Sequence, residues 1–196
     1  MNFNKPKNET EIHFLLKEIS KYILFGWGYN KLATEVGSMW DNDISKLFHK
    51  QGKSQKNIVD AVGLKKISLG RGKFYYDMKA IEAKASLSDY KNGFCGASAR
   101  TYIISSVGTI PIELIPKHIG FIEVDIDKFE LKKWSQKIPD MQGVKLVRQA
   151  KKKIDSRFKS EEKYRKWCAE SLERIAHRSS SELLFWRNYI EFSSKK

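Results

Sequence analysis

Two apolar segments of strand length contain charged residues in their interior, and this pattern limits what the chain can fold into. The first, Ile58–Leu64 (IVDAVGL), contains Asp60. The second, Lys73–Ala85 (KFYYDMKAIEAKA), contains Glu82 and Lys84 after aromatic and β-branched residues that favour a strand. A carboxylate buried in such a strand costs several kcal/mol unless something pairs with it. The fold must therefore bring a partner to these acids.

The remaining patterns predict an α/β fold in the order α-β-β-β-α-β, followed by one further strand and then by helices. Thr10 can cap a helix whose apolar residues recur at helical spacing, and Gly26 and Gly28 end it. A weak second helix is expected to begin near Ser86. Further strands are predicted at 31–36, 101–107 and 120–124, and a short helix or an ordered loop at 38–56.

The chain is strongly basic, with 37 Lys and Arg against 23 Asp and Glu and a net charge of +14. Through Glu130 there are 19 basic and 15 acidic residues, and after it 18 and 8. Such an excess favours polyanionic partners, with nucleic acid first among them. Basic residues interleaved with aromatic ones can follow a phosphate backbone. The predicted nucleic-acid-binding residues are Lys132, Lys133, Lys145, Arg148, Lys151, Lys152, Lys153 and Arg157. The alternative is that they form an ordinary solvated helix face.

This charge division predicts a core at residues 1–130 and a basic helical extension at 131–196. Within the extension, apolar residues recur at the spacing of an amphipathic helix, among them Tyr164, Trp167, Leu172 and Ile175. Their apolar stripe needs a cover. Either the main core or a second copy in a homodimer could provide it.

Asp60, Glu82 and Lys84 can form a site for phosphodiester chemistry. Glu82 and Lys84 share one face of their strand, because side chains alternate with period two. If the strand with Asp60 lies alongside, two carboxylates converge with an ammonium group. The carboxylates suit Mg²⁺, with Mn²⁺ expected to substitute. A metal there would lower the pKa of a bound water, and the lysine could orient or polarise the nucleophile.

The spacing of Asp60 and Glu82-x-Lys84 within this order of elements resembles the PD-(D/E)xK nuclease superfamily. More narrowly, residues 10–126 are similar to its MmcB-like DNA-repair branch, through IVDAVGL, IEAKASLSDY and YIISSVGTIPIELIPKHIGFIEVD. The resemblance implies a restriction-endonuclease-like αβββαβ core with a mixed central sheet. The sequence departs from the pattern of this branch after Asp89. There the chain is about one helical turn shorter than in the branch, and Gly93-Phe94 replaces a Lys-Trp pair.

The resemblance also implies roles for individual residues. Asp60 and Glu82 would be the metal ligands and Lys84 the catalytic lysine. Glu35 matches an additional acid on the preceding strand. Other branches place this acid on the first helix, where Glu11 or Glu18 would serve. Asp77 competes with Asp60, but it lies five residues before Glu82 and so on the opposite face of a regular strand.

These observations predict a Mg²⁺-dependent DNA endonuclease that acts in DNA processing, repair or restriction. Two alternatives stay open: a catalytically inactive DNA-binding module on the same scaffold, and an RNA-directed nuclease. No apolar run is long enough for a membrane-spanning helix, and no secretory signal begins the sequence, so a cytoplasmic protein is expected. Cys95 and Cys168 are expected to be reduced and structural.

Overall fold

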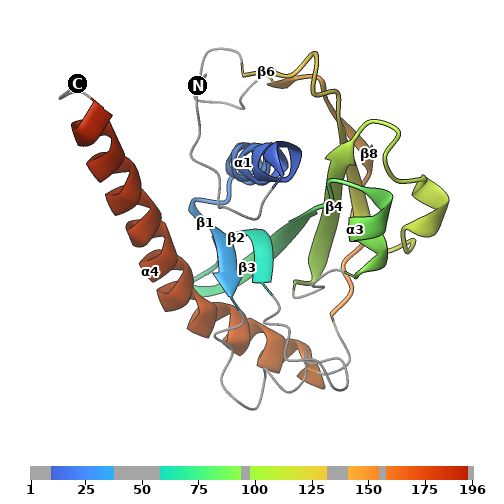
Figure 1. Cartoon of the computed structure of the whole chain (residues 1–196). Coiled ribbons are helices and arrows are strands. Elements are labelled where there is room, and N and C mark those ends of the chain that lie inside the picture. Colours follow the sequence, from blue (N-terminus) through green and yellow to red (C-terminus); the bar gives the residue numbers. More distant parts are fainter. Residues whose placement is uncertain (1–9, 38–57, 94–97, 132–140, 155–157, 194–196) are drawn as a thin grey trace.

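The computed structural model describes residues 10–37, 58–93, 98–131, 141–154 and 158–193 (Figure 1). The described elements are α1 (Glu11–Gly26), β1 (Lys31–Gly37), β2 (Ile58–Gly70), β3 (Lys73–Ala83), α3 (Leu87–Lys91), β4 (Arg100–Ser106), the 3-10 turn η1 (Ile112–Leu114), β5 (Gly120–Val124), β6 (Glu130–Leu131), β7 (Met141–Gln142), β8 (Val144–Arg148) and α4 (Glu161–Ser193). They follow the predicted order through β5. The expected helix or loop at 38–56 lies outside the described residues.

A six-stranded mixed sheet in the order β1-β2-β3-β4-β5-β8 forms the centre of the fold. The first three strands form an antiparallel meander, β3, β4 and β5 run parallel, and β8 returns antiparallel to β5. The strands β6 and β7 pair with each other in a separate small sheet. The predicted α/β class with a mixed sheet is therefore confirmed.

Helix α1 covers one face of the sheet (Figure 1). Thr10 caps it as predicted, and its side chain accepts a hydrogen bond from His13 N at 3.2 Å. Its apolar stripe packs on side chains from β2 to β5, and we call this group the α1-side cluster. Its buried members include Leu16, Ile19, Ile23, Leu24, Ala61, Ile81, Tyr102, Ile104 and Ile122.

Helix α4 packs on the opposite face, over β1 to β3, and forms the α4-side cluster. There Tyr164, Trp167, Cys168 and Ile175 are buried with Val62, Leu64 and Met78. Trp167 is 3% exposed and Ile175 1%. The chain's own core thus covers the apolar stripe of α4, and a second copy of the chain is not needed to bury it. Beside α4 on the same face, Ile110, Ile115 and Ile119 cover Ile103 and Phe121.

The prediction of a helical extension at 131–196, packed on or beside the core, is corrected for residues 144–148, because they form β8, an edge strand of the main sheet. The sequence VKLVR at 144–148 lies in a basic run, yet three of its five residues are the apolar Val144, Leu146 and Val147, two of them β-branched residues that favour a strand. Val144 packs on the α1-side cluster and Val147 on the group around Phe121. No helix in the described ranges is both long enough and apolar enough to cross a membrane.

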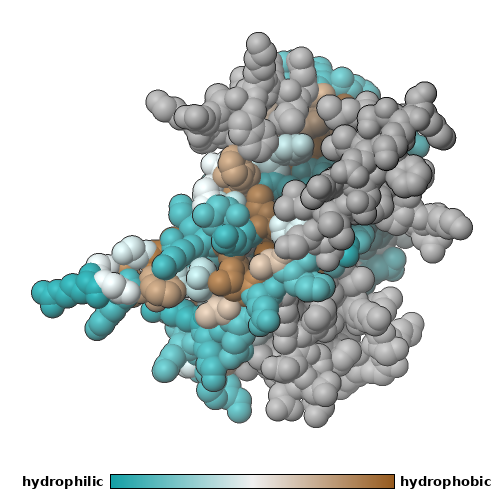
Figure 2. All heavy atoms as spheres, turned by 90° about the vertical axis from the view of Figure 1, so that its left-hand side faces the viewer, coloured by the Kyte–Doolittle hydropathy of each residue, from teal (hydrophilic) through white to brown (hydrophobic). Residues whose placement is uncertain are grey.

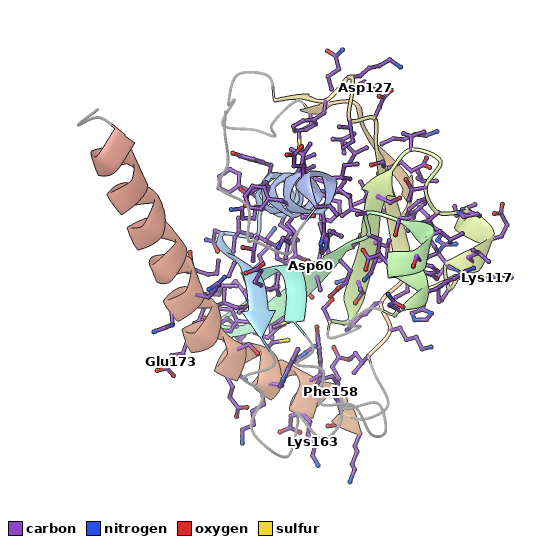
Figure 3. All side chains as sticks on the ribbon, viewed as in Figure 1. Asp60, Lys117, Asp127, Phe158, Lys163 and Glu173 are labelled. Carbon is purple, nitrogen blue, oxygen red and sulfur yellow. The ribbon has the colours of Figure 1, made fainter. Side chains whose placement is uncertain are left out.

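We expect Ile175→Ala to lower the free energy of unfolding by about 2–5 kcal/mol, because it leaves a cavity between α4 and the sheet. The control is Glu173→Ala on the same helix. Glu173 is exposed and points away from the sheet (Figure 3), so this change should cost less than about 0.5 kcal/mol. Urea unfolding measures both. Equal stabilities would contradict the packing of α4 on the core.

Candidate active site

The Asp60 carboxylate lies where α1, β2 and β3 meet (Figure 3). Its Oδ2 accepts a hydrogen bond from Ala83 N at 2.9 Å and lies 3.4 Å from His13 Nε2. The side chain of Asp60 is 13% exposed and that of His13 26%. Asp60 is therefore bound to the backbone of the Glu82-Ala83-Lys84 segment, as the predicted convergence of these segments requires.

The register of the sheet aligns three of the predicted acids. Thr34 pairs with Ala61 and Val36 with Val59, so Glu35 lies opposite Asp60. The ladder between β2 and β3 ends at the pair Ala61 and Ile81, and Asp60 and Glu82 are the residues directly beyond that pair. Glu35, Asp60 and Glu82 thus occupy one level across β1, β2 and β3.

Glu82 and Lys84 are among the most buried charged residues in the described part of the chain, at 3% and 7% exposure. Lys84 N donates to Ile104 O at 2.9 Å, and Lys84 Nζ lies 3.5 Å from Asp89 Oδ1. The other oxygen of Asp89 accepts from Ala85 N at 3.1 Å. Ser86 caps α3, as predicted. The start of α3 thus supplies an anion for the buried ammonium group of Lys84.

Glu35 has two cationic partners, one from each long helix. Its Oε1 accepts from Lys17 Nζ at 2.6 Å and its Oε2 from Arg178 Nη2 at 3.0 Å. Arg178 Nε also donates to Thr34 O at 3.1 Å. The φ of Glu35 is 50°, in the left-handed region, so these contacts accompany an irregular backbone in β1. Whether Glu35 serves as the additional acid stays a prediction.

The alternative acids on α1 have other surroundings. Glu18 pairs with Lys21 at 2.8 Å, and Glu11 is exposed in the first turn of the helix. Asp77 accepts from Tyr29 Oη at 2.6 Å and from Arg100 Nη1 at 3.3 Å. It pairs in register with Lys65. Asp77 therefore belongs to a different cluster from Asp60.

His13, Lys17 and Arg178 contact the predicted acids, although the sequence analysis did not assign them to the site. His13 and Lys17 are four residues apart on α1 and so share a helix face. This spacing of two basic residues beside the buried apolar stripe of α1 is the sequence signal that could have assigned them to the site. Arg178 carried no such signal, because more than 140 residues separate it from Glu35.

The donor types at this level fit Mg²⁺, which proteins often bind through one or two carboxylates together with water or substrate phosphate. Asp60 and Glu82 supply two carboxylates. Among the described residues, no group of three or more His, Cys, Asp and Glu side chains is arranged to bind a metal ion. A metal bound by Asp60 and Glu82 would take its remaining ligands from other groups, such as water or substrate phosphate.

The predicted nucleic-acid-binding residues have differing surroundings. Lys145, Lys151, Lys152 and Lys153 are exposed, and Lys152 Nζ lies 2.6 Å from Glu161 Oε1. Arg148 donates to three backbone carbonyls, those of Ile119, Ile115 and Pro116. It therefore secures the loop before β5, a structural role that the sequence did not indicate. Lys132, Lys133 and Arg157 lie outside the described residues.

Comparisons with known proteins support the fold alone. No family model matches the chain, and no curated protein does. A solved structure described as "SPO1766 protein of unknown function from Silicibacter pomeroyi" matches with a TM-score of 0.51 and 17% sequence identity. The match covers 91% of this chain and 93% of that one. The match therefore shows a shared fold over most of both chains.

We expect Asp60→Ala to destabilise the protein by about 1–3 kcal/mol, because the buried Ala83 N–H loses its acceptor. Asp60→Asn keeps a side-chain oxygen that can accept this bond, so it should cost less. Urea unfolding gives both stabilities, and hydrogen exchange of the Ala83 amide reports the bond directly. Equal stabilities and equal exchange rates in the two variants would contradict this role for Asp60.

Proposed function

We propose that this protein is a metal-dependent nuclease that hydrolyses phosphodiester bonds in DNA. The observation that carries the proposal is the hydrogen bond from Ala83 N to the Asp60 carboxylate. It joins the acid of β2 to the segment that contains Glu82 and Lys84, two charged residues that are largely buried. Two acids and an ammonium group on neighbouring, largely buried segments suit a phosphate that gains charge during hydrolysis.

Asp60 and Glu82 would bind the Mg²⁺ or Mn²⁺ ion. When bound, such an ion acidifies a water molecule and offsets charge on the phosphate. Lys84 would donate a hydrogen bond to a phosphate oxygen or to the attacking water. Asp89 contacts the Lys84 ammonium group and so orients it. His13, which is partly exposed beside Asp60, can accept or donate a proton there.

The arrangement of the elements also supports the proposal. The meander β1-β2-β3, followed by α3 and then by β4 parallel to β3, has the element order of the core that the resemblance implies. Asp60 and Glu82 occupy adjacent antiparallel strands of this meander, and Lys84 follows directly after β3. These are the places that the resemblance assigns to the two ligands and the lysine.

One observation favours a DNA-binding module without catalysis. Glu35 pairs with both Lys17 and Arg178, so two cations compensate the charge of the acid opposite Asp60. In this alternative, the acids and bases at the site stabilise the packing of α1 and α4 on the sheet. It predicts salt-sensitive DNA binding without metal-dependent cleavage.

We expect Glu82→Gln and Lys84→Gln each to lower the rate of DNA cleavage by about a hundredfold or more, because each removes a charge from the reacting region. Plasmid and branched-DNA cleavage with Mg²⁺ or Mn²⁺ measures this, and EDTA should abolish it. Glu113→Gln and Lys117→Gln make the same changes at exposed positions and should leave the rate unchanged.

Full activity in both site variants would rule out the assigned site. Metal-independent binding with no cleavage by the unaltered protein would favour the DNA-binding module. Matched RNA and DNA substrates distinguish an RNA-directed nuclease.

A further inference from the structure

The hairpin of β2 and β3 extends beyond the strands on either side of it. The pairing of β1 with β2 ends at Lys31 and Leu64, and that of β3 with β4 begins at Lys79 and Arg100. Residues 65–78 therefore form a two-stranded ribbon with no third strand among the described residues. The ribbon runs away from the viewer in Figure 1 and forms the narrow arm at the left of Figure 2.

The ribbon is basic and has a tight turn at its tip. Between Ala61 and Tyr76 the sequence contains Lys65, Lys66, Arg71 and Lys73 but no acid. At the turn, Gly70, Arg71 and Gly72 have φ values of 81°, 49° and 75°. Three successive left-handed residues favour glycine, and the glycines on both sides allow Arg71 to occupy the apex. Four cations are thus concentrated on a narrow projection.

Large apolar side chains lie exposed among these cations. Leu69 is 59% exposed and Phe74 47%. Lys66 Nζ lies 3.8 Å from the centre of the Phe74 ring, so cationic and apolar groups share one surface. In Figure 2, hydrophilic and hydrophobic residues alternate along the arm. An isolated two-stranded hairpin is marginally stable in water, and exposed apolar groups at its tip add nothing to that stability.

The base of the ribbon is fixed to the core. Tyr76 packs against the α4-side cluster. The guanidinium carbon of Arg165 on α4 lies 4.4 Å from the centre of the Tyr75 ring. The tip therefore projects from an anchored base.

We propose that the tip of this hairpin, residues 66–74, binds double-stranded DNA. Three cations without an acid complement a line of phosphates, and the major groove admits a two-stranded β-ribbon. Apolar side chains beside the cations suit the groove walls, where they can contact thymine methyl groups or wedge between base steps. The inference rests on the proposed function for the identity of the polymer, but DNA binding at the tip does not require cleavage.

The test measures the affinity of the full chain for a fluorescent 30-base-pair duplex in EDTA at several salt concentrations. Lys66→Gln, Arg71→Gln and Lys73→Gln together should weaken binding by about tenfold or more at 0.1 M salt and lower the salt slope by about 3. Leu69→Ser with Phe74→Ser should weaken it by about tenfold at an unchanged slope. Circular dichroism checks that the variants fold.

The control replaces three exposed lysines on other parts of the chain, Lys91, Lys117 and Lys163, by Gln. Lys117 and Lys163 point outward at separate edges of the molecule (Figure 3). A control variant that loses as much affinity and slope as the hairpin variant would overturn the proposal. So would a hairpin variant that loses binding to vesicles of anionic lipid but keeps duplex binding, which would make the tip a membrane contact.

The hairpin inference and the nuclease proposal can be disproved independently of each other. If Glu82→Gln abolishes cleavage while the hairpin variants bind and cut normally, only the hairpin inference is overturned. If the unaltered protein does not cut DNA but the hairpin variants lose duplex affinity, the hairpin inference holds and the nuclease proposal fails.

Discussion

The burial of charged groups at one level of the sheet is the constraint on which the rest of this structure depends. Glu82 and Lys84 are largely buried, and an uncompensated charge in such surroundings is strongly unfavourable. Every helix near this level contributes a charged or polar contact. Helix α1 brings His13 to Asp60 and Lys17 to Glu35, α3 brings Asp89 to Lys84, and α4 brings Arg178 to Glu35. The helices are thus placed by apolar packing and also by the charges they compensate.

The sequence was sufficient to predict the elements that local patterns encode. Asp60 and Glu82 lie in adjacent strands, Thr10 caps α1, and the described elements follow the predicted order through β5. The contact of Arg178 with Glu35 could not be predicted, because it depends on how α4 docks on the sheet. Strand β8 was missed for a different reason. Its five residues lie in a densely basic run and lack a regular alternation of apolar and polar side chains, so the composition suggested a helix surface.

The net charges of the segments before and after residue 130 conceal where the basic residues act. The part up to Glu130 is nearly balanced overall, yet it contains the basic hairpin tip of β2 and β3, residues 66–74, which has three cations and no acid. In the basic part that follows, Arg148 binds backbone carbonyls and Arg178 pairs with Glu35. A basic residue that satisfies an internal partner adds to the net charge but has fewer donors available for a phosphate. Local charge on an exposed element is therefore better evidence for a polyanion than the total of +14.

The two proposed contacts with DNA share strands, and this gives them a defined separation. Asp60 and the turn at Gly70 lie ten residues apart on β2. At roughly 3.3 Å per residue, a strand of that length spans about 30 Å. One turn of B-DNA is about 34 Å long. A duplex lying along the ribbon would therefore reach from the hairpin tip to the acids at Asp60 within about one helical turn. Because the ribbon is anchored at its base, the distance between the hairpin tip and the candidate site is fixed. Binding at the tip would then set the position along the duplex at which the candidate site meets the backbone.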